Sequence, residues 1–263
     1  MTQDTPQPHN TPPQPEAAHP TAAIVLIGNE LLSGRVEDEN GRYLIRELRR
    51  LGVELQALHI VPDDVQRIGE AVRRASERWT YVFTSGGVGP THDDVTIEAL
   101  SAAFDVEMTP NAGLEKAIQD HFGDDPVQLQ AWLPMALVPK GCSLVFNGNN
   151  MWPLLVMDNV YVMPGIPELF RAHFEAIAER FESGRFYTRT VYVRMGEGEL
   201  AAVLMEASAA NTAVLFGSYP VMHASDYKVR VTLESKKRDA MTDAFRWLMG
   251  RIDRRWIYKV VDD

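Results

Sequence analysis

Three short loops hold the side chains of this sequence that could do chemistry. They comprise residues 28–34, 85–94 and 164–167, and each follows a run of mainly apolar residues. Glycines in such loops allow positive φ angles and let backbone N–H groups approach an anion closely. A helical pattern follows the middle loop, and the N-terminal end of a helix also favours negative charge. We therefore expect the middle loop to hold a phosphate group.

The glycines of the middle loop match neither of the two common nucleotide-binding motifs. No Lys-Ser or Lys-Thr pair follows them, as it would in a Walker P-loop, and the third glycine of a Rossmann fingerprint is missing. Taken alone, the glycines are also typical of a purely structural turn between a strand and a helix. The function of the loop must therefore be argued from the residues around it.

Acidic side chains accompany this loop. Asp93 and Asp94 close the loop itself, and either one suits the N-cap of the following helix. Asp63 ends the neighbouring predicted strand, and Glu30 lies in the first loop. Several carboxylates around a phosphate would repel it unless a divalent cation lies between them. The pattern therefore favours a metal-assisted phosphate site with oxygen ligands.

Other candidate residues are open to two interpretations. His92 could contact a phosphate or face the solvent. Trp132, Trp152 and Phe146 could stack on a flat ring, although aromatic residues more commonly pack in a core. The remaining histidines show no ligand spacing, and Cys142 has no partner that would make it a nucleophile.

The composition excludes several classes of protein. The 263 residues include 36 acidic and 26 basic side chains, for a net charge of −10. This balance, without a Lys/Arg cluster, argues against binding nucleic acid through its phosphates. A single cysteine excludes an internal disulfide, and no apolar run approaches the roughly 20 residues that span a bilayer. The N-terminus lacks a signal-peptide pattern. We expect a cytoplasmic protein that binds neither membranes nor nucleic acid.

The elements that must position the loops alternate between strands and helices. Residues 1–20 contain six prolines and few aliphatic side chains, which predicts a disordered tail. After it, apolar runs at 22–27, 53–61 and 79–84 predict strands, with amphipathic helices between them. This alternation predicts a mostly parallel sheet, and the loops at the carboxyl ends of its strands should meet in one crevice.

The second half of the chain predicts a hairpin and a smaller domain. Asp158-Asn159 separates two short apolar runs, and Pro167 suits the first position of a helix that runs to residue 181. Further patterns predict, in order, strand 187–194, helix 198–208, strands 213–216 and 226–234, and helix 238–252. The alternation of apolar and polar residues from 227 to 233 indicates a sheet with one solvent-exposed face. We expect a small α+β domain with an open split-βαβ-like sheet over residues 185–258.

Three motifs resemble the molybdopterin-binding (MoaB/Mog-like) domain, and more closely its N-terminal branch in the competence/damage-inducible protein CinA. They are Ile27-Gly28-Asn29-Glu30-Leu31-Leu32-Ser33-Gly34, Gly86-Gly87-Val88-Gly89-Pro90-Thr91-His92-Asp93-Asp94-Val95-Thr96 and Pro164-Gly165-Ile166-Pro167-Glu168. The stretch from Trp152 to Leu169, with Gly217-Ser218-Tyr219-Pro220, is most similar to the N-terminal domain of eukaryotic FAD synthases. The resemblance covers roughly residues 22–255.

The resemblance implies a fold and a set of site residues. The fold is a three-layer α/β sandwich with a mostly parallel sheet over residues 21–181, followed by the small α+β domain. Asp63 and Asp94 would be catalytic, and Glu30, Asp63, Asp93 and Asp94 would hold a metal. The phosphate- or nucleotide-binding residues would be Gly28, Ser33, Gly34, Gly86, Gly87, Gly89, Pro90, Thr91, Thr96, Pro164 and Gly165.

The resemblance also implies a reaction. CinA-type and FAD-synthase-type domains are associated with metal-dependent hydrolysis of a nucleotide pyrophosphate such as FAD or ADP-ribose, here with Mg²⁺, Mn²⁺ or Co²⁺. The molybdenum-cofactor branch instead binds a pterin phosphate and supports its adenylation. A third alternative is a non-catalytic nucleotide-binding module, which Asn29 favours because the family usually has an acid there. Members commonly self-associate, so we expect a homodimer or homotrimer.

Overall fold

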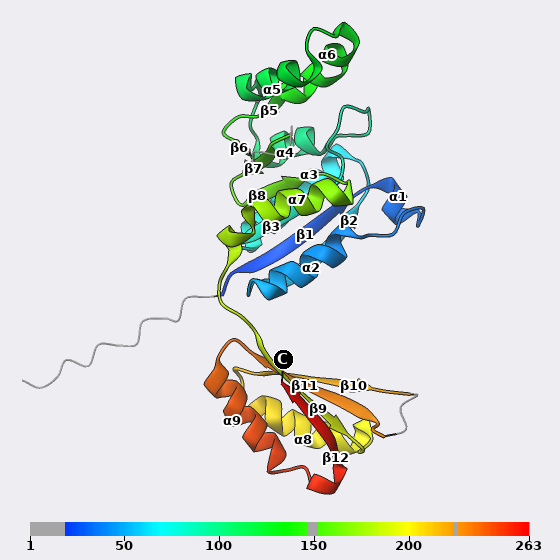
Figure 1. The fold of residues 1–263 in the computed structure, drawn as a ribbon, viewed down its shortest axis with the longest axis vertical. Coiled ribbons are helices and arrows are strands. Elements are labelled where there is room, and N and C mark those ends of the chain that lie inside the picture. The colour runs from blue at the N-terminus through cyan, green and yellow to red at the C-terminus, as the bar shows by residue number, and fades with distance from the viewer. Residues whose placement is uncertain (1–18, 147–151, 223–225, 263) are drawn as a thin grey trace, which may run out of the picture.

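The computed structural model describes residues 19–146, 152–222 and 226–262. Two sheets with separate cores follow one another along the chain (Figure 1). Most of the predicted tail and the Gly/Asn-rich stretch at 147–150 lie outside the described residues. Within them, no helix combines the length and apolar character needed to cross a membrane.

The first sheet has six strands in the order β2-β1-β3-β8-β7-β6. Four neighbouring strands are parallel: β1 (Thr21–Ile27), β2 (Glu54–Val61), β3 (Tyr81–Ser85) and β8 (Val160–Met163). Two antiparallel strands complete one edge: β6 (Ser143–Val145) and β7 (Leu154–Met157). The predicted mostly parallel sheet and the predicted hairpin are confirmed.

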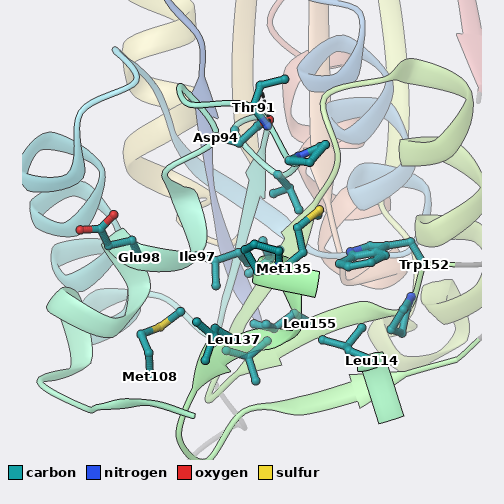
Figure 2. Close-up of a pocket in the computed structure, with 18 of the residues that line it drawn as sticks. Thr91, Asp94, Ile97, Glu98, Met108, Leu114, Met135, Leu137, Trp152 and Leu155 are labelled. Atoms are coloured by element: carbon teal, nitrogen blue, oxygen red, sulfur yellow. Dashed lines mark hydrogen bonds between the residues drawn. The ribbon is translucent and has the colours of Figure 1, made fainter. Parts of the chain in front are cut away.

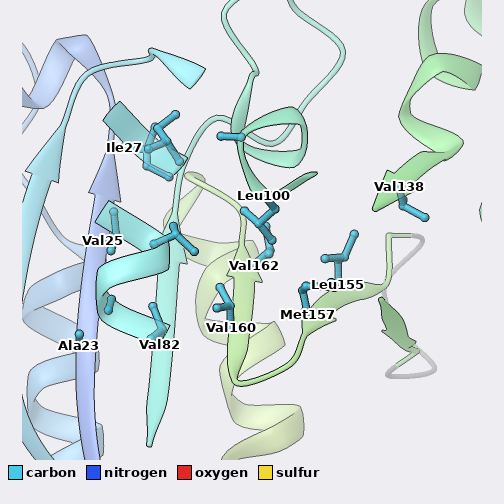
Figure 3. Packing of buried hydrophobic residues seen from close by; sticks show 14 of the residues in the cluster. Ala23, Val25, Ile27, Val82, Leu100, Val138, Leu155, Met157, Val160 and Val162 are labelled. Carbon is cyan, nitrogen blue, oxygen red and sulfur yellow. The ribbon is translucent and has the colours of Figure 1, made fainter. Parts of the chain in front are cut away.

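Helices cover both faces of this sheet, which confirms the three-layer sandwich. One face carries α3 (Val65–Arg78) and α4 (Thr96–Phe104), and the other carries α2 (Asn40–Arg50) and α7 (Pro167–Ile177). Figure 3 shows how side chains of β1, β3 and β8 and Leu100 of α4 meet in the first of these two cores. Burial of these apolar side chains fixes the strand ends that carry the loops.

Several helix boundaries follow local signals in the sequence. Asp64 caps α3 by accepting a hydrogen bond from the backbone N–H of Arg67 at 2.9 Å, and Pro167 occupies the first turn of α7. Gly52 follows α2 with a φ of 79°, a conformation that favours glycine. The prediction that Asp93 or Asp94 caps α4 is wrong, because its N-cap is Val95. The two aspartates instead accept hydrogen bonds from Thr91 within the loop.

A helical excursion between α4 and β6 folds over one end of the first core. It contains, in order, β4 (Met108–Pro110), α5 (Ala112–Phe122), α6 (Pro126–Trp132), a 3₁₀ turn (Leu133–Ala136) and β5 (Leu137–Pro139). Asn111 caps α5, because its side-chain oxygen accepts a hydrogen bond from the backbone N–H of Gly113 at 2.9 Å. The excursion supplies one wall of the site described below.

The C-terminal domain is an antiparallel sheet in the order β10-β11-β9-β12 with two helices. Its elements are β9 (Tyr187–Val193), α8 (Glu197–Ala210), β10 (Leu215–Pro220), β11 (Val229–Ser235), α9 (Arg238–Met249) and β12 (Ile257–Asp262). Short 3₁₀ turns lie at Ala178–Phe181 and Arg254–Trp256. The predicted α+β domain is confirmed. Strand β12, which the sequence analysis did not predict, completes its βαββαβ order.

Candidate functional site

The middle loop begins with two glycines that no other residue could replace without strain. Gly86 and Gly87 have φ angles of 103° and 64°. A Cβ on Gly86 would lie 2.2 Å from the carbonyl oxygen of Ile27, and one on Gly87 would lie 2.4 Å from Oγ1 of Thr96. Both the conformation and the close approach therefore require glycine. The backbone N–H of Gly86 also donates to the carbonyl of Met163 at 3.2 Å, which joins the loop to β8.

Buried polar side chains hold this loop from behind. Thr96 is fully buried, and its hydroxyl donates to the carbonyl of Gly86 at 2.9 Å. Nδ2 of Asn40 donates to Oγ of Ser85 at 2.9 Å and to the carbonyl of Gly165 at 2.7 Å. Asn40 thereby links the end of β3 to the third loop. Thr96, which we expected to bind phosphate, lies behind the loop and braces it.

Two carboxylates converge on one hydroxyl at the far end of the loop. Oγ1 of Thr91 lies 2.7 Å from Oδ1 of Asp93 and 2.5 Å from Oδ2 of Asp94. The backbone N–H of Thr91 also donates to Oδ2 of Asp94 at 3.0 Å. Hydrogen bonding to the Thr91 hydroxyl, then to its own backbone, lowers the pKa of Asp93, and nearby His92 adds to this. These contacts explain why neither aspartate caps α4.

The other two predicted metal ligands, Asp63 and Glu30, lie at the first loop. Oδ2 of Asp63 accepts a hydrogen bond from the backbone N–H of Asn29 at 2.8 Å, so it shapes the first loop. Glu30 is exposed on that loop. Within the described residues, no three His, Cys, Asp or Glu side chains come together in a group that could hold a metal ion. The structure thus does not bring Glu30, Asp63, Asp93 and Asp94 together as one preformed group, and a metal at these residues stays a prediction.

Two adjoining cavities border the middle loop. The first, here called the apolar cavity, has a volume of about 460 Å³, and the second, the strand-end cavity, about 490 Å³. They share a wall formed by Gly87, Val88, Gly89, Pro90, Asp94, Met135 and Trp152. In Figure 2 Thr91 and Asp94 lie at one end of the apolar cavity, and the side chains of Met108 and Leu137 lie at the other. The middle loop therefore lines both cavities.

The strand-end cavity lies where three parallel strands finish. Its lining combines residues that follow β1, β3 and β8 with residues of α6 and α7: Glu30, Gly86, Pro164, Gly165, Ile166, Trp132, Leu169 and His173. The expected crevice at the carboxyl ends of the strands is therefore present. In the part of the chain that the structure describes, Gly28, Ser33 and Gly34 line neither of these two cavities.

Sequence reasoning missed part of this lining. His173 is only 3% exposed, and within the described structure its Nδ1 has no hydrogen-bond partner. Burial lowers the pKa of its imidazole, so the ring is neutral near pH 7. The rings of Trp132 and Trp152 lie 6.2 Å apart beside the same cavity. His173 has no recognisable spacing to other ligands in the sequence, because only the packing of α7 brings it to the cavity.

The remaining candidates lie away from the cavities. The His92 side chain is 98% exposed, which favours the solvent-facing interpretation. Phe146 is exposed, and burial raises the pKa of the Cys142 thiol, which makes it less reactive.

Comparison with known proteins places the chain. Residues 23–183 match the family described as a probable molybdopterin binding domain, and residues 185–261 match the middle domain of FAD synthase. The chain belongs to the molybdopterin-binding domain family. The resemblance seen in the three motifs is therefore confirmed, and the family name points to a small-molecule ligand.

Individual relatives agree with this assignment. A protein of Archaeoglobus fulgidus is 34% identical over 197 residues, which cover 75% of this chain and 84% of that protein. A probable FAD synthase of Caenorhabditis elegans is 29% identical over 258 residues, 88% of this chain but 49% of that protein. The chain thus spans about half the length of that relative. The crystal structure of CinA from Thermoplasma acidophilum, of unknown function, aligns with a TM-score of 0.56 and 29% identity, over 62% of this chain and 99% of that one.

Proposed function

We propose that this protein hydrolyses the pyrophosphate bond of a dinucleotide such as FAD or ADP-ribose. The observation that carries the proposal is the wall of residues 87–90 that both cavities share. Such a substrate has two bulky halves joined by a pyrophosphate. The loop can therefore hold the pyrophosphate while one half occupies each cavity. The volumes of about 460 and 490 Å³ are within the usual range of ligand sites.

The donors at the loop fit a divalent cation that arrives with its phosphate. Asp93 and Asp94 present carboxylate oxygens next to the Thr91 hydroxyl. Mg²⁺ in nucleotide sites is commonly held by one or two carboxylates together with phosphate oxygens of the substrate. A site of this kind needs no group of three acidic side chains. When bound, Mg²⁺, Mn²⁺ or Co²⁺ would polarise a phosphoryl oxygen and lower the pKa of a water molecule.

The residues of the chain itself would contribute binding and orientation. Backbone N–H groups of the loop would stabilise the negative charge that develops on the phosphoryl oxygens. Asp94 borders both cavities, so its carboxylate is placed to orient the attacking water and accept its proton. Addition of this water breaks the P–O–P bridge and leaves two monophosphates. Asp63 would act as a positioning residue, because it holds the backbone of the first loop.

A second candidate function is binding without hydrolysis. The family to which residues 23–183 belong is described as a probable molybdopterin binding domain, which favours a pterin phosphate as ligand. Adenylation of such a pterin would also use the phosphate loop. Asn29, which stands where the family usually has an acid, favours a module that binds a nucleotide without turning it over.

A hydrolysis screen separates these functions. The purified protein is incubated with FAD, ADP-ribose or NADH and with Mg²⁺, Mn²⁺ or Co²⁺, beside an Asp94→Ala variant. The matched control is Asp243→Ala, which removes an exposed aspartate of α9. We expect metal-dependent release of AMP that only Asp94→Ala abolishes. Tight binding of a nucleotide or pterin without turnover under any metal would contradict hydrolysis and support the binding function.

A further inference from the structure

Among the described residues, no helix of the C-terminal domain itself covers the second face of its sheet, which Arg49 of α2 contacts at Glu234 and Thr188. Helices α8 and α9 pack on the same side of the sheet (Figure 1), against side chains such as Val191, Val231 and Leu233. Side chains alternate between the two faces of a strand, so their neighbours in the sequence point to the other face. This second face, here called the open face, is unrelated to the two cavities of the first domain.

The strand register places four side chains of the open face in one row. Tyr219 of β10 pairs with Arg230 of β11, and Arg230 pairs with Tyr192 of β9. Tyr192 pairs in turn with Lys259 of β12. Aromatic and cationic side chains therefore alternate across the whole width of the sheet, on strands about 4.8 Å apart. We call these four residues the tyrosine–cation row.

The cations of the row lie over its aromatic rings. The guanidinium of Arg230 is 4.8 Å from the ring centre of Tyr219, and Nζ of Lys259 is 4.4 Å from that of Tyr192. Both cations are exposed, and Tyr219 is 48% exposed. The row thus presents both flat rings and positive charge to the solvent.

More aromatic groups extend the row at one end, and small side chains lie beside it. Tyr227 packs edge-on against Tyr192 with ring centres 4.8 Å apart, and it stacks with Tyr258 at 5.7 Å. The adjacent cross-strand row consists of Gly217, Thr232, Thr190 and Val261 in the order of their pairing.

The charge of the chain is divided unevenly between its two parts. Residues 185–263 hold 13 of the 26 basic but only 10 of the 36 acidic side chains, a net charge of +3. Residues 1–184 carry a net charge of −13, and the two parts together give the total of −10. The acidic balance that argued against nucleic acid therefore describes the first part of the chain and not residues 185–263.

We propose that the open face binds single-stranded nucleic acid across the tyrosine–cation row. Unpaired bases stack on Tyr219 and Tyr192, and backbone phosphates contact Arg230 and Lys259. Bases of a duplex are stacked on one another and are not available to such a platform. The row contains no aliphatic side chain, which disfavours a protein partner because protein interfaces have apolar centres. RNA and single-stranded DNA share the chemistry that this face recognises.

Fluorescence anisotropy with labelled oligonucleotides tests the proposal. The full chain is titrated against oligouridylate, oligothymidylate and a duplex, each of about 12 nucleotides, at low and at physiological salt. The charge variant combines Arg230→Gln with Lys259→Gln. Its matched control combines Arg238→Gln with Arg246→Gln, which removes the same charge from α9 on the helical side.

The expected results are specific to the row. The unmodified chain binds one or both single strands more tightly than the duplex, and the affinity falls as salt rises. The charge variant binds about tenfold or more weakly with a flatter salt dependence, whereas the control stays within about twofold. Tyr219→Ala weakens binding by about tenfold at every salt concentration, because stacking is not screened. Circular dichroism verifies that each variant is folded.

Several results would overturn the proposal. These are no binding of either single strand at low salt, equal binding of the duplex, or equal losses in the charge variant and its control. A charge variant that changes the oligomeric state of the chain without any binding of oligonucleotides would assign the open face to self-association. The hydrolysis reaction is independent of these results, because the row is remote in sequence from residues 86–94.

Discussion

The first and the middle glycine loops look alike in the sequence but differ in how they are held. Both follow parallel strands that pair directly, β1 and β3. The middle loop rests on the buried side chains of Thr96 and Asn40, and it borders two cavities. The first loop is held through Asp63, and a Cβ on its Gly34 would meet nothing within 4 Å.

This difference shows what a glycine loop needs in order to bind an anion. Backbone N–H groups stabilise charge effectively only when the surrounding structure fixes their direction. Glycine makes the required conformation accessible, but buried hydrogen bonds select it. This contrast supports our proposal that the middle loop holds the phosphate and that most of the first loop has a shaping role.

Adding one methyl group to each loop tests this contrast most strongly. Gly86→Ala places a Cβ 2.2 Å from the carbonyl oxygen of Ile27 at a φ of 103°. We expect the free energy of unfolding to fall by about 3 kcal/mol and nucleotide binding to be lost. In Gly34→Ala the added Cβ contacts nothing, and only the φ of 69° is strained. We therefore expect its free energy of unfolding to fall by about 1 kcal/mol. Urea unfolding measures both variants, and equal losses would contradict the contrast.

Removing the brace behind the middle loop gives a smaller effect. Thr96→Val keeps the shape of the side chain but deletes the hydroxyl that donates to Gly86. Because the buried carbonyl then loses this donor, we expect a loss of about 2 kcal/mol of stability together with weaker nucleotide binding. Ser33→Ala is the matched control in the first loop, where the hydroxyl donates to an exposed carbonyl at 3.3 Å. If Thr96→Val binds nucleotide as tightly as the unmodified chain, the loop does not depend on this brace.

A buried imidazole, that of His173, lies beside the strand-end cavity. Burial holds the pKa of His173 below its ordinary value of 6.5, so the folded state binds fewer protons than the unfolded state below that pH. Stability should therefore fall as the pH drops below about 6.5, by at most about 1.4 kcal/mol per pH unit from this group. His173→Gln should flatten this dependence in urea unfolding, whereas His121→Gln, an exposed control, should not.

The smallest effect is expected in the first loop. Asp63→Asn leaves a carbonyl oxygen that can still accept the hydrogen bond from the backbone of Asn29. If Asp63 only positions the loop, the rate of hydrolysis should change by less than about threefold. A loss of about 10²-fold or more would show that its charge takes part in catalysis, as the family resemblance implied.

Local signals made much of the fold predictable. The proline that begins α7 and the turn at Asp158 each act within a few residues, so the sequence alone was sufficient. The start of α4 was mispredicted because the Asp94 carboxylate accepts a hydrogen bond from the backbone N–H of Thr91, which precedes it in the loop. Strand β12 forms by pairing with β9, more than 60 residues earlier, and that pairing leaves little trace in the local pattern.

The site was predictable only where it is contiguous. The middle loop is one uninterrupted motif, and the structure places its glycines, Thr91 and Asp94 at the cavities as expected. Met135 and His173 come from two distant segments that the sequence analysis did not single out, and tertiary packing alone brings them to the strand-end cavity. The four predicted metal ligands do not form one group in the structure, because closeness of loops in the sequence pattern does not fix the direction of a carboxylate.

A crystal structure with a methylene-bridged analogue of ADP-ribose and Mg²⁺ tests the central claim most directly. The bridge cannot be hydrolysed, so the ligand remains where it binds. We expect its phosphates against the backbone of residues 87–91, with one half in the apolar cavity and the other in the strand-end cavity. Phosphates bound instead at residues 28–34, or a ligand confined to one cavity with its phosphates away from Asp94, would contradict the assignment.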